Sequence, residues 1–278
     1  MTPRFLPAAA FLTAVGVGCA PLAHHPRSGI PTVVYSEPRA DAITFWGHSC
    51  AYIDVEGFGI VTDPVFSHRY ATIRRRLIPA PPPDVYDQTR VILISHAHQD
   101  HLDPATLDRF SPRTVILAPY PSARYLRKHG FRATVMRPGD EYPFPGGTII
   151  AVPARHPGGR LSLKARSDGR AIGFVIRTAE GTVYYTGDTE YFSGFTRIAE
   201  GFHPNILLLN LNAHLHSEDA LQAIEDLHSP VVVPLHLGAY DGKSESMGPR
   251  WRSELVDSLG ARVIPLEVGQ SLPLRPDR

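Results

Sequence analysis

One short run of residues constrains this chain more than any other feature. Residues 96–101 read His-Ala-His-Gln-Asp-His and follow an apolar run of strand length at 91–95. Imidazoles and carboxylates bind divalent metals, and residues two apart on a tight loop can point to the same side. We therefore interpret the run as part of a metal site, in which His96 and His98 face one cation while Asp100 and His101 face another.

A metal site that performs chemistry keeps one coordination position open and takes its remaining ligands from elsewhere in the chain. Three downstream side chains each follow an apolar run of strand length, namely His156, Asp188 and His236. Taken singly, each has a plainer interpretation, as a hydrogen-bonded loop histidine or as a capping aspartate. Their shared position after apolar strands favours one common site.

The composition is that of an ordinary globular protein. The 278 residues are 43% hydrophobic and 20% charged, which is enough for one large core. The formal net charge of +1 supplies no general field that would attract nucleic acid, so we expect no nucleic-acid partner. Oligomeric state is not encoded in any pattern that we recognise.

Short apolar runs alternate with a few amphipathic stretches along the chain. The predicted strands are 42–46, 50–55, 58–62, 91–95, 114–118, 133–136, 148–152, 171–177, 182–186, 205–210, 231–235 and 262–266. The predicted helices are 104–110, 122–129, 217–227 and 249–259. Many strands with helices between them predict one α+β domain, from residue 41 to residue 278, with its sheets in the middle.

The first residues differ from the rest of the chain. Residues 1–19 carry an early arginine and then an uncharged apolar stretch, which predicts a signal peptide. Gly16-Val17-Gly18-Cys19 resembles the lipobox of bacterial lipoproteins, and this resemblance implies a lipid on Cys19. We expect an exported protein of the cell envelope, anchored to a membrane through Cys19, with cleavage between small residues as the alternative. Residues 20–40 predict a tether.

The complete set of metal-binding residue types is similar to that of the metallo-β-lactamase superfamily, whose pattern is His-x-His-x-Asp-His followed by a His, an Asp and a His. The resemblance extends from Asp41 to about Glu267. It implies a single-domain, four-layer αβ/βα sandwich with the site at one edge of two sheets. It also implies two divalent metal ions, with zinc as the first candidate and manganese or iron as alternatives. The implied ligands are His96, His98 and His156 for the first ion, Asp100, His101 and His236 for the second, and Asp188 as the bridge between them.

Flanking motifs refine the resemblance. The runs 46–49 (Trp-Gly-His-Ser), 61–64 (Val-Thr-Asp-Pro) and 236–238 (His-Leu-Gly) resemble the branch that contains N-acyl-phosphatidylethanolamine phospholipase D and the ascorbate-6-phosphate lactonases. This implies a hydrolase that uses a metal-bridging hydroxide on a phosphodiester or phospholipid, as a phospholipase D does. Hydrolysis of a lactone or another carboxylic ester is the alternative. A non-catalytic, metal-binding envelope lipoprotein is an alternative of another class.

The resemblance also suggests roles around the metals. Asp100, Asp188 and His214 are the expected catalytic residues, while Asp63 and His48 are expected to orient ligands from behind. A turn-forming aspartate and a backbone-bonded histidine are the plain alternatives for Asp63 and His48.

Substrate contacts are expected from two other segments. Arg155 and Arg160 belong to a basic stretch that can hold a phosphate or form a solvated face, and Tyr191 is a further expected substrate-binding residue. The run Arg74-Arg75-Arg76 predicts a second basic patch, which either rests on anionic lipid headgroups or is an exposed loop.

Overall fold

The computed structural model describes residues 40–70, 74–157, 170–212, 214–215, 217–237, 239–240, 257–258 and 262–275. The expected signal peptide with Cys19 lies outside the described residues, as does nearly all of the expected tether. Arg160 and almost all of the expected helix at 249–259 also lie outside them. In the described part of the chain, no helix is both long and apolar enough to cross a membrane.

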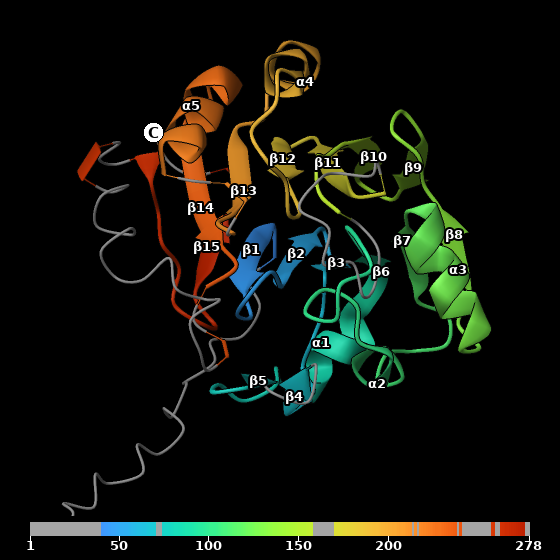
Figure 1. Cartoon of the computed structure of the whole chain (residues 1–278). Helices are drawn as coiled ribbons and strands as arrows, with labels where there is room; N and C mark the ends of the chain where they lie inside the picture. The colour runs from blue at the N-terminus through green and yellow to red at the C-terminus, as the bar shows by residue number, and fades with distance from the viewer. Residues whose placement is uncertain are drawn as a thin grey trace, which may run out of the picture.

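Two sheets form the centre of the molecule (Figure 1). The first sheet has the strand order β15-β1-β2-β3-β6-β7-β8 and the second has the order β14-β13-β12-β11-β10-β9. The strands of the first sheet are β1 (Ala42–Phe45), β2 (Ala51–Val55), β3 (Phe58–Thr62), β6 (Thr89–Leu93), β7 (Val115–Ala118), β8 (Ala133–Val135) and β15 (Ser271–Pro273). Those of the second are β9 (Glu141–Phe144), β10 (Gly147–Pro153), β11 (Ile172–Thr178), β12 (Thr182–Tyr185), β13 (Ile206–Asn210) and β14 (Val231–Leu235).

Each sheet combines antiparallel hairpins with a parallel set. In the first sheet β3, β6, β7 and β8 run parallel, and in the second β12, β13 and β14 do. The turn between β2 and β3 uses Glu56 at φ 50° and Gly57 at φ 79°, the positive φ pair that suits a two-residue hairpin. Parallel strands bring their carboxyl ends to one edge, and the polar residues that follow them therefore gather there.

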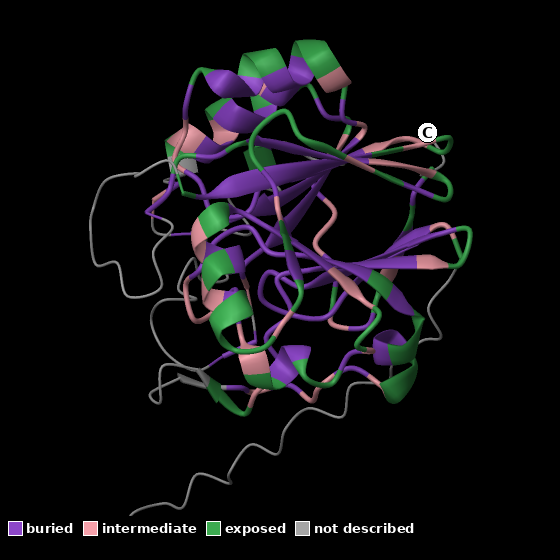
Figure 2. Ribbon diagram, turned by 90° about the vertical axis from the view of Figure 1, so that its right-hand side faces the viewer, coloured by how far each residue is buried: buried purple, intermediate pink, exposed green. Residues whose placement is uncertain are grey.

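Helices cover the outer face of each sheet. Helices α1 (Pro83–Gln88), α2 (Pro104–Leu107) and α3 (Tyr120–Lys128) pack on the first sheet, and α4 (Gly194–Phe202) and α5 (Ser217–Leu227) pack on the second. Between the sheets lies a third apolar cluster that includes Ile53, Leu93, Phe174 and Leu208. Figure 2 shows the strands of both sheets largely buried and the helices with exposed outer surfaces. The four-layer αβ/βα sandwich expected from the sequence is therefore confirmed.

The interior elements match the sequence prediction, whereas several peripheral ones do not. Helix α5 has the predicted bounds, and its Ala220, Ile224 and Leu227 are buried as the apolar spacing requires. The predicted strand 262–266 is reduced to one bridge between Val263 and Val232, and α2 ends at Leu107, before the predicted end at residue 110. Helices α1 and α4, strands β9 and β15, and the short hairpin of β4 (Arg69–Tyr70) with β5 (Arg74–Arg75) were not predicted.

The exposed basic patch expected at residues 74–76 is wrong for Arg76. Its side chain is buried, with 4% of its surface exposed. The guanidinium donates to the carbonyl oxygens of Val65 and Trp46, at 2.9 and 3.0 Å. These bonds satisfy carbonyl oxygens in the loops that follow β1 and β3, and they join the two loops.

Candidate metal centre

The predicted ligands lie at the carboxyl ends of strands from both sheets. The run 96–101 follows β6, His156 follows β10, Asp188 follows β12 and His236 follows β14. Because the two sheets face each other, these strand ends meet across the gap between them. The structure therefore brings together side chains that are up to 140 residues apart in sequence, the separation of His96 and His236 (236 − 96).

Three imidazoles form a first group. His96, His98 and His156 each offer a nitrogen that lies within 4.8 Å of the others. Nδ1 of His98 is 3.2 Å from Nε2 of His156. His96 and His156 are almost fully buried, while His98 is half-buried.

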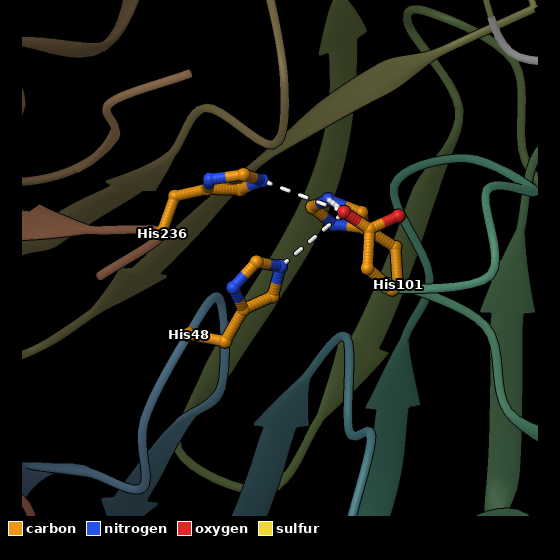
Figure 3. A group of neighbouring side chains, drawn as sticks. His48, His101 and His236 are labelled. Carbon is orange, nitrogen blue, oxygen red and sulfur yellow. Dashed lines mark ion pairs between the residues drawn. The ribbon is translucent and has the colours of Figure 1, made fainter. Parts of the chain in front are cut away.

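A second group contains three imidazoles and a carboxylate. His48, Asp100, His101 and His236 each offer a ligand atom within 4.8 Å of the others. Oδ2 of Asp100 is 3.5 Å from Nε2 of His48 and 3.8 Å from Nε2 of both His101 and His236. In Figure 3 the ion pairs of His48 and His236, drawn as dashed lines, run to this carboxylate beside His101.

Asp188 lies between the two groups. Its Oδ2 is 3.5 Å from Nε2 of His101 and from Nε2 of His236, and 3.8 Å from Nε2 of His156. One carboxylate oxygen thus faces imidazoles of both groups, which is the arrangement that a bridging ligand requires.

The protonation states of His156, His236 and Asp188 suit cation binding. Burial lowers the pKa of His156 to about 4 and that of His236 to about 3, so that both rings are neutral at pH 7. Burial alone would raise the pKa of Asp188, but the surrounding histidines, His236 and His101 foremost, outweigh it and hold this pKa well below its ordinary value. Neutral imidazoles and ionised carboxylates are the forms that bind metals.

Asp63, at the end of β3, is a hydrogen-bond hub behind both groups. Its Oδ2 accepts from Nδ1 of His101 at 2.7 Å and from Oγ of Ser95 at 2.5 Å. Ser95 Oγ in turn lies 2.9 Å from Nδ1 of His96. Since the serine hydroxyl donates to Asp63, it accepts from Nδ1–H of His96, which leaves Nε2 of His96 unprotonated toward the site. Burial alone would lower the pKa of His101, but Asp188 and Asp100 outweigh it and hold this pKa well above its ordinary value, so a cation at Nε2 of His101 would replace a proton.

The residues present fit a metal. Nε2 of His96 is buried and has no hydrogen-bond partner within the described ranges. An orphaned buried polar atom is costly, and a cation bound to its lone pair would satisfy it. Nε2 of His98 is likewise buried and has no hydrogen-bond partner among the described residues. Imidazoles with carboxylates are the donor set that zinc, manganese and iron accept, so the two groups can hold divalent cations.

Asn210, the last residue of β13, is a site residue that the sequence analysis missed. Its Nδ2 donates to Oδ1 of Asp188 at 3.0 Å, and it lies 3.0 Å from Oγ of Ser49. The side chain is completely buried. The one sequence signal for Asn210 was its place at the end of an apolar strand, close to the strand-end positions of Asp188 and His236.

The three described residues expected to act on substrate lie in different surroundings. His214 is half-buried, and its ring centroid is 4.9 Å from that of His156. Arg155 is exposed, with its guanidinium 5.9 Å from the ring centroid of Phe192. The hydroxyl of Tyr191 donates to Asp226 of α5 at 2.7 Å. Of these three, His214 is thus in ring contact with the imidazole groups, and the substrate roles stay predictions.

The family can now be assigned. A model of the beta-lactamase superfamily domain matches residues 59–237, a span that includes the run 96–101, His156, Asp188 and His236. The chain belongs to the metallo-β-lactamase superfamily. Its sandwich and its paired histidine and aspartate groups are those of a metal-dependent hydrolase of this superfamily.

Relatives agree with this assignment. The chain is 29% identical to a UPF0173 metal-dependent hydrolase of Exiguobacterium sp. over 204 residues, 71% of this chain and 86% of that protein. It is similar to the metallo hydrolase Igni18 of Ignicoccus hospitalis, with 25% identity, a TM-score of 0.65, and coverage of 83% of this chain and 97% of that one. An isothiocyanate hydrolase from Delia radicum gut bacteria shares the fold at a TM-score of 0.69 and 21% identity, over 83% of this chain and 98% of that one.

Proposed function

We propose that this superfamily member is a binuclear metallohydrolase that cleaves phosphodiesters, with phospholipids as its substrate class. The observation that carries the binuclear part is the place of Asp188, whose Oδ2 faces His156 of one group and both His101 and His236 of the other. In this proposal His96, His98 and His156 hold one cation, Asp100, His101 and His236 hold the second, and Asp188 contacts both.

Two bound cations, zinc first among the candidates, would polarise the substrate and lower the pKa of a water molecule. The chain itself supplies the framework for this chemistry. Asp63 and Asn210 hold ligands from behind, so the donors are oriented before substrate arrives. His214, beside His156, is proposed to contact the substrate at the mouth of the site.

The phosphodiester assignment draws on sequence motifs and on charge near the site. It rests on the motifs 46–49, 61–64 and 236–238, which resemble the phospholipase D and lactonase branch. Arg155 adds an exposed cation one residue before His156, where it can attract a phosphate. A lipid on Cys19, detectable by mass spectrometry, would keep the enzyme at a membrane, and this is part of the proposal.

The test is turnover by metal-loaded protein of three substrate sets: vesicles containing N-acyl-phosphatidylethanolamine, a chromogenic phosphodiester, and a panel of lactones. Asp100→Asn is the inactive comparison, and His129→Gln, at an exposed histidine on the far end of α3, is the matched control. We expect phosphodiester cleavage in wild type and His129→Gln and its loss in Asp100→Asn.

Other outcomes reject specific parts of the proposal. Turnover of lactones alone would favour the carboxylic-ester alternative. Stoichiometric metal without turnover of any ester would favour a metal-binding role without catalysis. A lack of phosphodiester cleavage above the Asp100→Asn level removes the phosphodiester assignment.

A further inference from the structure

His48 lies on the loop between β1 and β2, outside the ligand pattern of the run 96–101 and the three later strand ends. Its imidazole is buried, with 2% of the residue exposed. Its ring centroid is 4.1 Å from that of His236 and 5.5 Å from that of His101. Figure 3 shows the three rings around one carboxylate.

Distances between donor atoms test whether four side chains can share one cation. Two donors that are each about 2.1 Å from a metal are about 3.4 Å apart in a tetrahedral site and at most about 4.2 Å apart when they lie opposite each other. Nε2 of His48 is 3.5 Å from Oδ2 of Asp100. The same oxygen is 3.8 Å from His101 and from His236, so His48 is closer to Asp100 than either expected ligand is.

The backbone of His48 has an uncommon conformation and is hydrogen-bonded to the loop of His236. His48 has φ 56° and His236 has φ 68°, a left-handed conformation that is uncommon outside glycine and is found mostly in asparagine, aspartate and histidine. The two residues are joined directly, since the amide N–H of His236 donates to the carbonyl oxygen of His48 at 2.7 Å. The N–H of His48 donates to the carbonyl oxygen of Leu237 at 3.1 Å, which completes a bridge between the two loops.

This bridge fixes the two imidazoles as a pair. Gly47, just before His48, has φ 93°, and a Cβ there would lie 2.3 Å from Cδ1 of Ile78. The turn is therefore packed tightly on one side while His48 projects into the site. Uncommon backbone conformations of this kind cluster at functional sites.

We propose that His48 is a direct ligand of the second cation, in addition to Asp100, His101 and His236. The inference rests on the proposed binuclear centre and deepens it. With Asp188 included, the second position then has five protein donors, whereas the first has His96, His98, His156 and Asp188. The two positions are unequal, and the one with fewer protein donors is the one that keeps room for water or substrate.

The competing interpretation is that His48 only donates a hydrogen bond to Asp100 and so positions it. A crystal structure of zinc-loaded wild-type protein separates the two interpretations. Nε2 of His48 within about 2.6 Å of the cation supports ligation, because zinc–nitrogen bonds are about 2.0–2.1 Å long. A longer distance, with zinc present on His101 and His236, overturns it.

Variants supply a readout in solution that is independent of activity. His48→Asn retains a residue that tolerates positive φ, and His48→Gly removes both the imidazole and the strain. We expect each variant to bind one zinc ion as wild type does and to bind the other at least about 10-fold more weakly, by chelator competition and elemental analysis. Unchanged affinity for both ions in folded variants contradicts ligation.

Added imidazole tests for the missing ring itself. In His48→Gly, millimolar imidazole should raise the affinity for the weakened ion and shift the visible spectrum of the cobalt-substituted protein toward that of wild type. His129→Gln should bind two ions and show no response to imidazole. If wild-type protein holds no stoichiometric metal, the proposed function itself fails, whereas a two-metal wild type with His48 out of bonding distance contradicts this inference alone.

Discussion

At the scale of single residues, Asp63 orients ligands of both groups through hydrogen bonds. It accepts from Nδ1 of His101 directly, and it acts on His96 through Ser95. Tyr185 also donates to its Oδ2, and burial followed by the charge of Asp63 holds the pKa of that phenol well above its ordinary value. The aspartate is therefore surrounded by donors, and a neutral amide cannot replace it.

Asp63→Asn is expected to weaken binding of both metal ions by about 10- to 100-fold, because the amide nitrogen faces groups that donate. Chelator competition measures the effect. Asp54→Asn is the control, since Asp54 is also a buried aspartate of the first sheet, where it accepts from the amide of Gly57. Equal losses in the two variants would mean that Asp63 acts on stability and not on the ligands.

Asn210 acts on the proposed bridge. Removing its amide in Asn210→Ala frees one oxygen of Asp188, and we expect metal affinity to fall about 10-fold. Asn205→Ala is the matched control, because Asn205 binds the backbone of Thr182 and Leu274 away from the site. Isothermal titration of apo protein with zinc compares them, and indistinguishable affinities would remove Asn210 from the site.

At the scale of elements, the turn after β12 couples the two sheets. Gly187 has φ 56°, and a Cβ there would lie 2.5 Å from the Cβ of Ser95 and 3.2 Å from the carbonyl oxygen of Ile172. The close approach to Ser95 is what allows Asp188, from the second sheet, to reach the ligands of the first.

Gly187→Ala should therefore destabilise the fold by roughly 1–3 kcal/mol and displace Ser95 from His96. Urea denaturation measures the first effect, and zinc stoichiometry measures the second. Gly57→Ala is the control, since Gly57 also has positive φ but has nothing within 4 Å of the added Cβ. A loss of metal in both variants would show that backbone strain, and not the contact with Ser95, is responsible.

Sequence reasoning found the elements that carry strong patterns. Interior strands such as β6 and β13 contain continuous apolar runs, and α5 shows a regular apolar face, so each was predicted. Strands β9 and β15 were missed because each is short, lies at a sheet edge and contains a proline. Helix α4 was missed because it begins at a glycine and has no side-chain cap.

Sequence reasoning likewise found some residues of the site and missed others. The run 96–101 and the strand-end residues were noticed because chemistry and position coincide in the sequence. Ser95 and Asn210 are single polar residues at strand ends, and their partners are set by the docking of two sheets. The closeness of His48 to His236 depends on a bridge between His48 and Leu237, which are 189 positions apart (237 − 48), and no local pattern reveals it.

At the scale of the whole molecule, metal removal is expected to lower thermal stability. A ligand that binds only the folded state stabilises it by about 2.7 kcal/mol at a free concentration 100-fold above its Kd. For a chain of this size, each kcal/mol shifts Tm by about 2–4 °C. Calorimetry of zinc-loaded and chelator-treated protein should therefore show a difference of several degrees, and identical Tm values would contradict metal binding at the centre.

The division of the ligands between the sheets has one more consequence. His48, Asp63 and the run 96–101 belong to the first sheet, while His156, Asp188 and His236 belong to the second. Neither half of the chain contains a complete donor group for the second cation, because His236 must meet Asp100 and His101. Binding of the second cation therefore requires the two halves of the chain to be docked on each other. Two separately produced halves should reassemble more readily with zinc present than without it.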